Sequence, residues 1–152
     1  MNYFLQQDFD RLNLKITEIC DKIKQIGQEM GESCREGAET FHDNFAYEDG
    51  ERQQALLGGR LRQYISVRNN ARIVKEEPQM NMVTIGKTVQ LVDENNQPHT
   101  YRIGSYLTFE DDDVTISYNS PLARLIIGAK VGEKRSGSVG HSKKTFTISS
   151  VS

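Results

Sequence analysis

The segment FDRLNLKITEICDKIKQIGQEM, residues 9–30, decides the fold of this chain. Its apolar residues alternate in steps of three and four, at Phe9, Leu12, Ile16, Ile19, Ile23, Ile26 and Met30. Side chains with this spacing form one narrow stripe along a helix, the a/d seam of a coiled coil. The polar residues on both sides of the stripe favour a two-helix hairpin over a helix packed on a broad globular core. Asp8 directly precedes the stripe and is the predicted N-cap.

The second arm is predicted after residue 50, where Leu57, Leu61, Tyr64 and Ala71 keep the same phase and Arg68 fills the position between the last two. Two arms of roughly thirty residues would each reach on the order of 45 Å. Each glycine in the two arms weakens the helix propensity by about 1 kcal/mol. The glycines are Gly27, Gly31 and Gly37 on the first arm, and Gly50, Gly58 and Gly59 on the second. Either small residues let the arms approach closely near the tip, or the distal part frays until a partner orders it.

Pro78 breaks the helical pattern, and from Met82 onward the apolar period changes to two. Ser120 and Pro121 read as the cap and first position of a short helix that stops at Gly128. The predicted strands are Val83–Ile85, Thr88–Val92, His99–Tyr106, Val114–Tyr118, Lys134–Val139 and Lys143–Val151, with the helix at Leu122–Ile127. We therefore expect an α+β protein: a helical hairpin over residues 1–75, a linker over 76–81, and a small antiparallel β domain with one short helix over 82–152.

Charge is unevenly distributed along the 152 residues, although the net charge is only −2. The run from Arg52 to Lys75 holds six basic residues and no acid. This asymmetry favours a polyanion or an acidic groove as partner, against the alternative of a solvated helix face. Cys20 and Cys34 lie roughly 21 Å apart on one helix, so we expect free thiols. No apolar run is long enough to span a bilayer, which predicts a soluble, cytoplasmic protein.

The stretch ETFHDNFAYED, residues 39–49, joins the two predicted arms and packs four acids around aromatic residues. Acids at the turn of a hairpin lie far from any core and repel one another, so they have little structural use there. This pattern indicates that the tip of the hairpin inserts negatively charged side chains into a pocket of another molecule.

The C-terminal half contains the stretch ISYNSPLARLII, residues 116–127, followed by Val131-Gly132-Glu133, and the shorter stretch Tyr101-Arg102-Ile103. Both stretches resemble the Gre family of bacterial transcript cleavage factors, GreA and GreB. Gly59-Arg60-Leu61 on the second arm resembles the same family. The resemblance covers nearly the whole chain in the family's order, a coiled-coil hairpin, a linker and an FKBP-like domain.

The resemblance implies a function as a cytoplasmic, DNA-binding transcription elongation factor. Such a factor binds RNA polymerase at the rim of its secondary channel and inserts the hairpin. Acids at the hairpin tip then help to hold a second catalytic Mg²⁺, and the polymerase hydrolyses backtracked RNA. The protein would then have no enzymatic activity and no cofactor of its own, and it would act as a monomer on the polymerase and the nascent RNA 3′ end.

The resemblance allows each position of the family's tip motif to be matched to a residue of this sequence. Asp43, Asn44 and Tyr47 match its second acid, its Asn and its Tyr, whereas Thr40 stands at the position of the first acid. Glu39 would replace that acid if the turn is helical, because residues four apart share a helix face; Glu48 and Asp49 are further candidates. Arg52 and Arg60 resemble the basic patch for the RNA 3′ end, where phosphate charge dominates affinity. Ser120, Pro121, Leu122 and Arg124 would form the polymerase-docking surface.

Three functions follow. The first is a factor that stimulates RNA cleavage, and the second is a Gre-like channel regulator that inhibits or competes without cleavage, because of Thr40. The third is a stand-alone enzyme, a prolyl isomerase or a metal-dependent nuclease. Few aromatics are available for an isomerase pocket, and His42, His99 and His141 are too scattered to form a nuclease metal site.

Overall fold

The computed structural model describes residues 1–36, 45–78 and 81–152. The chain divides into two compact units, which we call the hairpin unit (Asp10–Asn70) and the head unit (Met1–Phe9 with Ala71–Ser152). The expected boundaries at residues 75 and 82 differ from this division, because the chain's first nine residues and residues 71–81 belong to the head unit.

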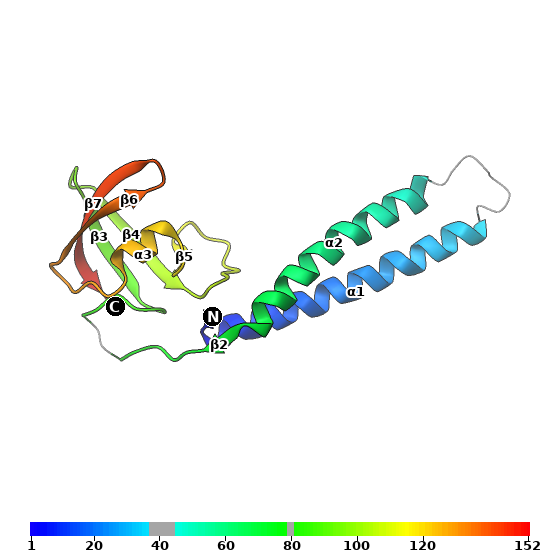
Figure 1. Ribbon diagram of the computed structural model, residues 1–152, viewed down its shortest axis with the longest axis horizontal. Helices are drawn as coiled ribbons and strands as arrows, with labels where there is room; N and C mark the ends of the chain where they lie inside the picture. The colour runs from blue at the N-terminus through cyan, green and yellow to red at the C-terminus, as the bar shows by residue number, and fades with distance from the viewer. Residues whose placement is uncertain (37–44, 79–80) are drawn as a thin grey trace. The chain divides into compact units, whose positions relative to one another are not determined.

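The hairpin unit is built from two helices, α1 (Gln6–Glu36) and α2 (Phe45–Asn69), and Figure 1 shows the two arms side by side. The first turn of α1 belongs to the head unit. The predicted stripe is the least exposed face of α1: Leu12, Ile16, Ile19 and Ile26 are buried, and Phe9, Ile23 and Met30 are partly buried. The seam predicted from the three-and-four spacing is therefore confirmed.

The second arm carries a matching but more polar stripe. Leu57, Leu61, Tyr64 and Arg68 are all partly buried, and Gly50 is the buried residue of this helix. The helix ends at Asn69, so the prediction of Ala71 in its stripe is wrong. Ala71 instead begins strand β2 (Ala71–Ile73), which pairs in parallel with β1 (Asn2–Phe4). The sequence analysis predicted neither of these three-residue strands.

The head unit contains a five-stranded sheet with the order β5-β4-β3-β7-β6. Its strands are β3 (Thr88–Asp93), β4 (Pro98–Gly104), β5 (Thr115–Ser117), β6 (Lys134–Val139) and β7 (Ser142–Val151), and the short helix α3 (Pro121–Ile126) follows β5. The α+β class is thus confirmed, but the sheet is mixed, because β5 pairs in parallel with β4. The chain between Gly104 and Thr115 loops back before it re-enters the sheet, which a hairpin turn would not do.

One predicted strand, Val83–Ile85, is absent from the described residues 81–152. Met82 makes only an isolated antiparallel bridge to Lys130, and the N–H of Val83 donates to the carbonyl of Ala129 at 2.9 Å. The chain then turns at once, since Lys87 N–H donates to the Thr84 carbonyl and Gly86 has a φ of 95°. Glycine adopts that conformation without steric cost, and the turn ends the pairing.

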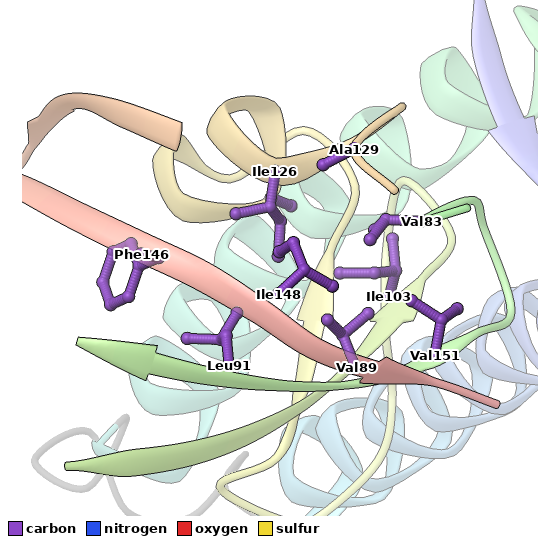
Figure 2. Packing of buried hydrophobic residues seen from close by; sticks show 10 residues of the cluster. Val83, Val89, Leu91, Ile103, Ile126, Ala129, Phe146, Ile148 and Val151 are labelled. Carbon is purple, nitrogen blue, oxygen red and sulfur yellow. The ribbon is translucent and has the colours of Figure 1, made fainter. Parts of the chain in front are cut away.

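The core of the head unit lies between α3 and the sheet. Figure 2 shows Ile126 of α3 directed toward Ile148 of β7, with Val89 and Leu91 of β3 beside them. The inward positions alternate along each strand, as the period of two requires. The buried cluster consists of Val83, Val89, Leu91, Ile103, Ala123, Ile126, Ala129, Phe146, Ile148 and Val151.

The N-terminal segment is part of the head unit and completes its packing. Phe4 is fully buried, with its ring 6.1 Å from that of Phe9 and 6.5 Å from that of Tyr106. Asp8, the predicted N-cap, lies instead in the first turn of α1 and is buried. None of the described helices combines the length and the apolar composition that crossing a lipid bilayer requires.

Candidate functional site

The segment before α3 is fixed by its own hydrogen bonds. Ser120 is the N-cap of the helix, and its hydroxyl oxygen accepts from the N–H of Ala123 at 3.3 Å. Pro121 occupies the first turn, where a missing N–H costs nothing. The hydroxyl of Ser117 donates to the Tyr106 carbonyl at 2.9 Å and accepts from the N–H of Asn119. The predicted cap is therefore confirmed, and the chain that carries Pro121 is held in one conformation.

The four predicted docking residues differ in exposure. Pro121 and Arg124 are exposed, whereas Ser120 and Leu122 are partly buried and Leu122 packs against the core cluster. The Arg124 guanidinium donates to the side-chain oxygen of Asn119, at 3.0 Å from Nε and 2.5 Å from Nη2. This pair holds a cation beside Pro121 at the head surface. A small rigid patch with one charge is the result, and it suits recognition of a protein surface.

The predicted RNA-binding arginines lie on α2. Arg52 and Arg60 are both exposed, and within residues 1–36, 45–78 and 81–152 neither makes an ion pair. Arg62 of the same helix is also exposed, and Arg68 is partly buried in its last turn. The second arm thus presents cations to solvent that an anionic ligand could neutralise.

Glu39, Asp43 and Asn44, three of the four predicted tip residues, lie outside the described residues. Tyr47 is described: it lies in the first turn of α2 and is partly buried. Of the further acids considered, Glu48 is exposed in that turn, whereas Asp49 accepts a hydrogen bond from Gln53 Nε2 at 2.8 Å. Glu48 is the acid of this turn that faces solvent, and it also suits the positive end of the helix dipole.

In the parts of the chain that the structure describes, no group of three or more His, Cys, Asp or Glu side chains could hold a metal ion. His99 is engaged elsewhere, since its Nε2 lies 2.9 Å from Asp93 Oδ2. Cys20 is a free thiol.

Two arrangements in the structure were not found from the sequence. A buried hydrogen-bond chain links Leu5, Ser105 and Asp8, and an apolar groove of about 370 Å³ in the head unit is lined in part by Tyr3, Tyr118 and Ile127. The first arrangement had no local signal, because Asp8 and Ser105 lie 97 positions apart in the sequence. The groove had no local signal either, because its walls come from segments far apart in the chain.

Comparison with known proteins identifies the class. The family model for the C-terminal domain of transcription elongation factors GreA and GreB matches residues 77–152, half of the chain. GreA of Caldanaerobacter subterraneus subsp. tengcongensis is 30% identical over 135 residues, which cover 85% of this chain and 78% of that protein. GreA of Mycolicibacterium vanbaalenii is 27% identical over 155 residues, with 98% and 93% covered.

A solved structure, GreA factor homolog 1 (Gfh1) of Thermus thermophilus, is 18% identical with a TM-score of 0.45, over 99% of this chain and 97% of that one. The family match over half of the chain and the 30% identical relative settle the assignment. This chain belongs to the GreA/GreB family of transcription elongation factors.

Proposed function

We propose that this protein binds RNA polymerase, inserts its hairpin into the secondary channel and stimulates cleavage of backtracked RNA. The observation that supports this proposal most is the hairpin itself, in a chain of the GreA/GreB family. Its two helices have 31 and 25 residues, and they flank residues 37–44, which contain Glu39 and Asp43. At about 1.5 Å per residue, arms of this size reach on the order of 40 Å into a narrow channel.

The contacts that we propose at the tip are made by carboxylates. Asp43 and Glu39 would each offer an oxygen ligand to a Mg²⁺ ion of the polymerase, and Asn44 and Tyr47 would orient them. Mg²⁺ keeps several waters and needs only one or two protein carboxylates, so a complete protein cage is not required. A second divalent ion supplies activation of water and stabilises charge at the scissile phosphate.

In the proposed site, most ligands of the Mg²⁺ ion would come from the polymerase. Glu48 adds an exposed carboxylate in the first turn of α2. The protein would then be no enzyme, and the catalytic residues of the reaction would belong to the polymerase.

Two further surfaces complete the proposal. Arg52 and Arg60, exposed on α2, would contact phosphates of the displaced RNA 3′ end. Ser120, Pro121, Leu122 and Arg124 would dock the head unit on the rim of the channel. Hydrogen bonds to Ser120 and Asn119 restrain this segment and the Arg124 side chain, which would reduce the conformational entropy lost on binding.

The test is a stalled-complex assay with purified bacterial RNA polymerase and radiolabelled RNA. We expect RNA shortening with the wild-type protein, and a strong loss of shortening with Asp43→Ala and with Glu39→Ala. Asp21→Ala, an exposed acid on α1, is the matched control and should keep activity. Slowed elongation without shortening would instead indicate a regulator that occupies the channel without cleavage. RNA hydrolysis by the protein alone would overturn the proposal.

A further inference from the structure

Gly50 of α2 and Met30 of α1 form a close contact between the two arms of the hairpin unit. Gly50 is buried, and a Cβ atom at this position would lie 2.5 Å from Cγ and 2.8 Å from Sδ of Met30. Carbon atoms do not approach that closely without displacement, so a larger residue would move Met30 or the arm. Ile26, one turn earlier on α1, lies 3.6 Å from the same point through its Cγ2.

A second contact lies one turn further along α2. The Gln54 side chain donates from Nε2 to the backbone carbonyl of Ile23 at 3.2 Å. A Cβ at Gly27 would meet that same Nε2 at 3.2 Å, so Gly27 leaves room for the amide. The glycines at positions 27 and 50 thus serve close approach of the arms, the first of the two alternatives that the sequence left open.

Other glycines of the hairpin do not share this role. A Cβ at Gly31 would meet nothing within 4 Å, and a Cβ at Gly59 would find only the guanidinium of Arg62, at 3.9 Å. Among the hairpin glycines that the structure describes, Gly27 and Gly50 are therefore the two with a close neighbour on the other arm. A cavity of about 240 Å³ borders the contact and is lined by Ile26, Glu29, Met30, Ala46, Asp49, Gly50 and Gln53.

We infer that the Gly50–Met30 contact is a positioning contact for cleavage: it sets the spacing of the arms and so fixes the first turn of α2. That turn carries Tyr47 and Glu48 and directly follows Asp43 and Asn44 in the sequence. The inference rests on the proposed function, because the role in cleavage that it assigns to the contact is part of that function. A displacement of about 1 Å at a catalytic constellation can cost on the order of 100-fold in rate.

The test adds side-chain volume at Gly50 of α2 and then removes side-chain volume at Met30 of α1. Gly50→Leu should lower the cleavage rate at saturating factor by about 10- to 100-fold, while affinity for the polymerase stays within about twofold. Met30→Ala combined with Gly50→Leu returns the space that the new side chain needs and should restore most of the rate. Gly59→Leu is the matched control on the same helix and should retain the wild-type rate. Unchanged affinity shows that the head unit of a variant is folded.

A measurement without polymerase accompanies the assay. Spin labels at Gln28 and Glu51, in a chain with Cys20→Ser and Cys34→Ser, report the distance between the arms. We expect this distance to lengthen with Gly50→Leu and to return in the double variant. A cleavage rate that is unchanged although the arms have separated would overturn the inference, as would a loss that Met30→Ala does not restore.

Failure of the proposed function has a different signature. A wild-type protein that shortens no RNA, or an Asp43→Ala variant with full activity, would overturn the proposed function and the cleavage role inferred for Gly50. The label distances would then still show whether the Gly50–Met30 contact sets the spacing of the arms.

Discussion

The hydroxyl of Ser105 donates a hydrogen bond to the Asp8 carboxylate, with 2.5 Å between Oγ and Oδ2, although 97 positions separate the two residues. Both side chains are buried, and the same hydroxyl oxygen accepts from the backbone N–H of Leu5 at 2.9 Å. Two hydrogen bonds through one buried hydroxyl thus join the N-terminal segment to the rest of the head unit.

Ser105→Ala should lower the free energy of unfolding by about 1–3 kcal/mol, because it removes a partner from a buried carboxylate and from a buried backbone donor. The measurement is urea unfolding, with hydrogen exchange at the amides of β3 as a probe of the head unit. Ser138→Ala, at an exposed position of β6, is the matched control. Equal unfolding midpoints for the two variants would contradict the expected role of Ser105.

An alanine should cost more stability at Gly104 than at Gly137. A Cβ at Gly104 would lie 2.5 Å from Thr108 Cγ2 and 3.1 Å from Thr115 Cγ2. Both neighbours are β-branched and stiff, so they cannot turn away at low cost. Gly104→Ala should therefore destabilise the head unit by about 1–3 kcal/mol, the usual cost of overpacking.

Gly137→Ala provides the comparison in the same sheet. Its Cβ would meet Cδ1 of Leu125 at 2.8 Å, the end of a side chain that can change rotamer. We expect a smaller loss of stability, measured by the same urea unfolding. If Gly137→Ala proved the more damaging of the two, side-chain stiffness would not be what sets the cost at these positions.

The carboxylate of Asp93 organises the turn between β3 and β4. A side-chain hydrogen bond with His99 is the main cause that lowers the pKa of Asp93 below its ordinary value of 3.8, and the N–H groups of Gln97 and Asn95 lower it further. The folded-state pKa is thus below the unfolded one. This stabilisation is present above a pH of 3.8 and is lost as the pH falls through the lowered pKa of the folded protein.

Asp93→Asn should therefore unfold at lower urea than the wild type at neutral pH, and the difference should shrink as the pH falls below about 3.8. Asp111→Asn, at an exposed position between β4 and β5, controls for the loss of one negative charge. A difference in midpoint that persisted unchanged to low pH would mean that the ionised carboxylate does not supply the stabilisation.

The parts of the fold that could be predicted are those with a local cause. The spacing from Phe9 to Met30 requires one helical face, and Ser120-Pro121 specifies a helix start without any distant contact. The same reasoning missed β1 and β2, since a three-residue strand has no period of its own and forms only because Asn2 meets Ala71 across the chain. It also missed that β5 runs parallel to β4, because the direction of a strand depends on the path of the preceding loop.

The candidate site divides in the same way. Exposure of Arg52, Arg60 and Arg124 follows from charge, which sequence shows directly. The contact of Gly50 with Met30 depends on which glycine faces which side chain across the arms, and the spacing within one helix does not determine that. Glu39, Asp43 and Asn44 were assigned through family resemblance, and their roles stay predictions.

The docking surface gives the last prediction, which separates binding from catalysis. Arg124 is exposed and held by Asn119, so Arg124→Glu should leave the stability of the head unit nearly unchanged. If this cation meets the polymerase, charge reversal should weaken binding by at least about 30-fold, the effect of an interface hot spot of about 2 kcal/mol. The cleavage rate at saturating factor should remain that of the wild type, because the hairpin is intact.

The measurement is a titration of polymerase with labelled factor, followed by the cleavage assay at saturation. Lys144→Glu reverses a charge at an exposed position of β7 and is the matched control. Arg124→Gln should have an intermediate effect on affinity, since it removes the positive charge without introducing a negative one. Wild-type affinity in Arg124→Glu would exclude Arg124 from the interface, and a lower rate at saturation would mean that the head unit also influences the position of the tip.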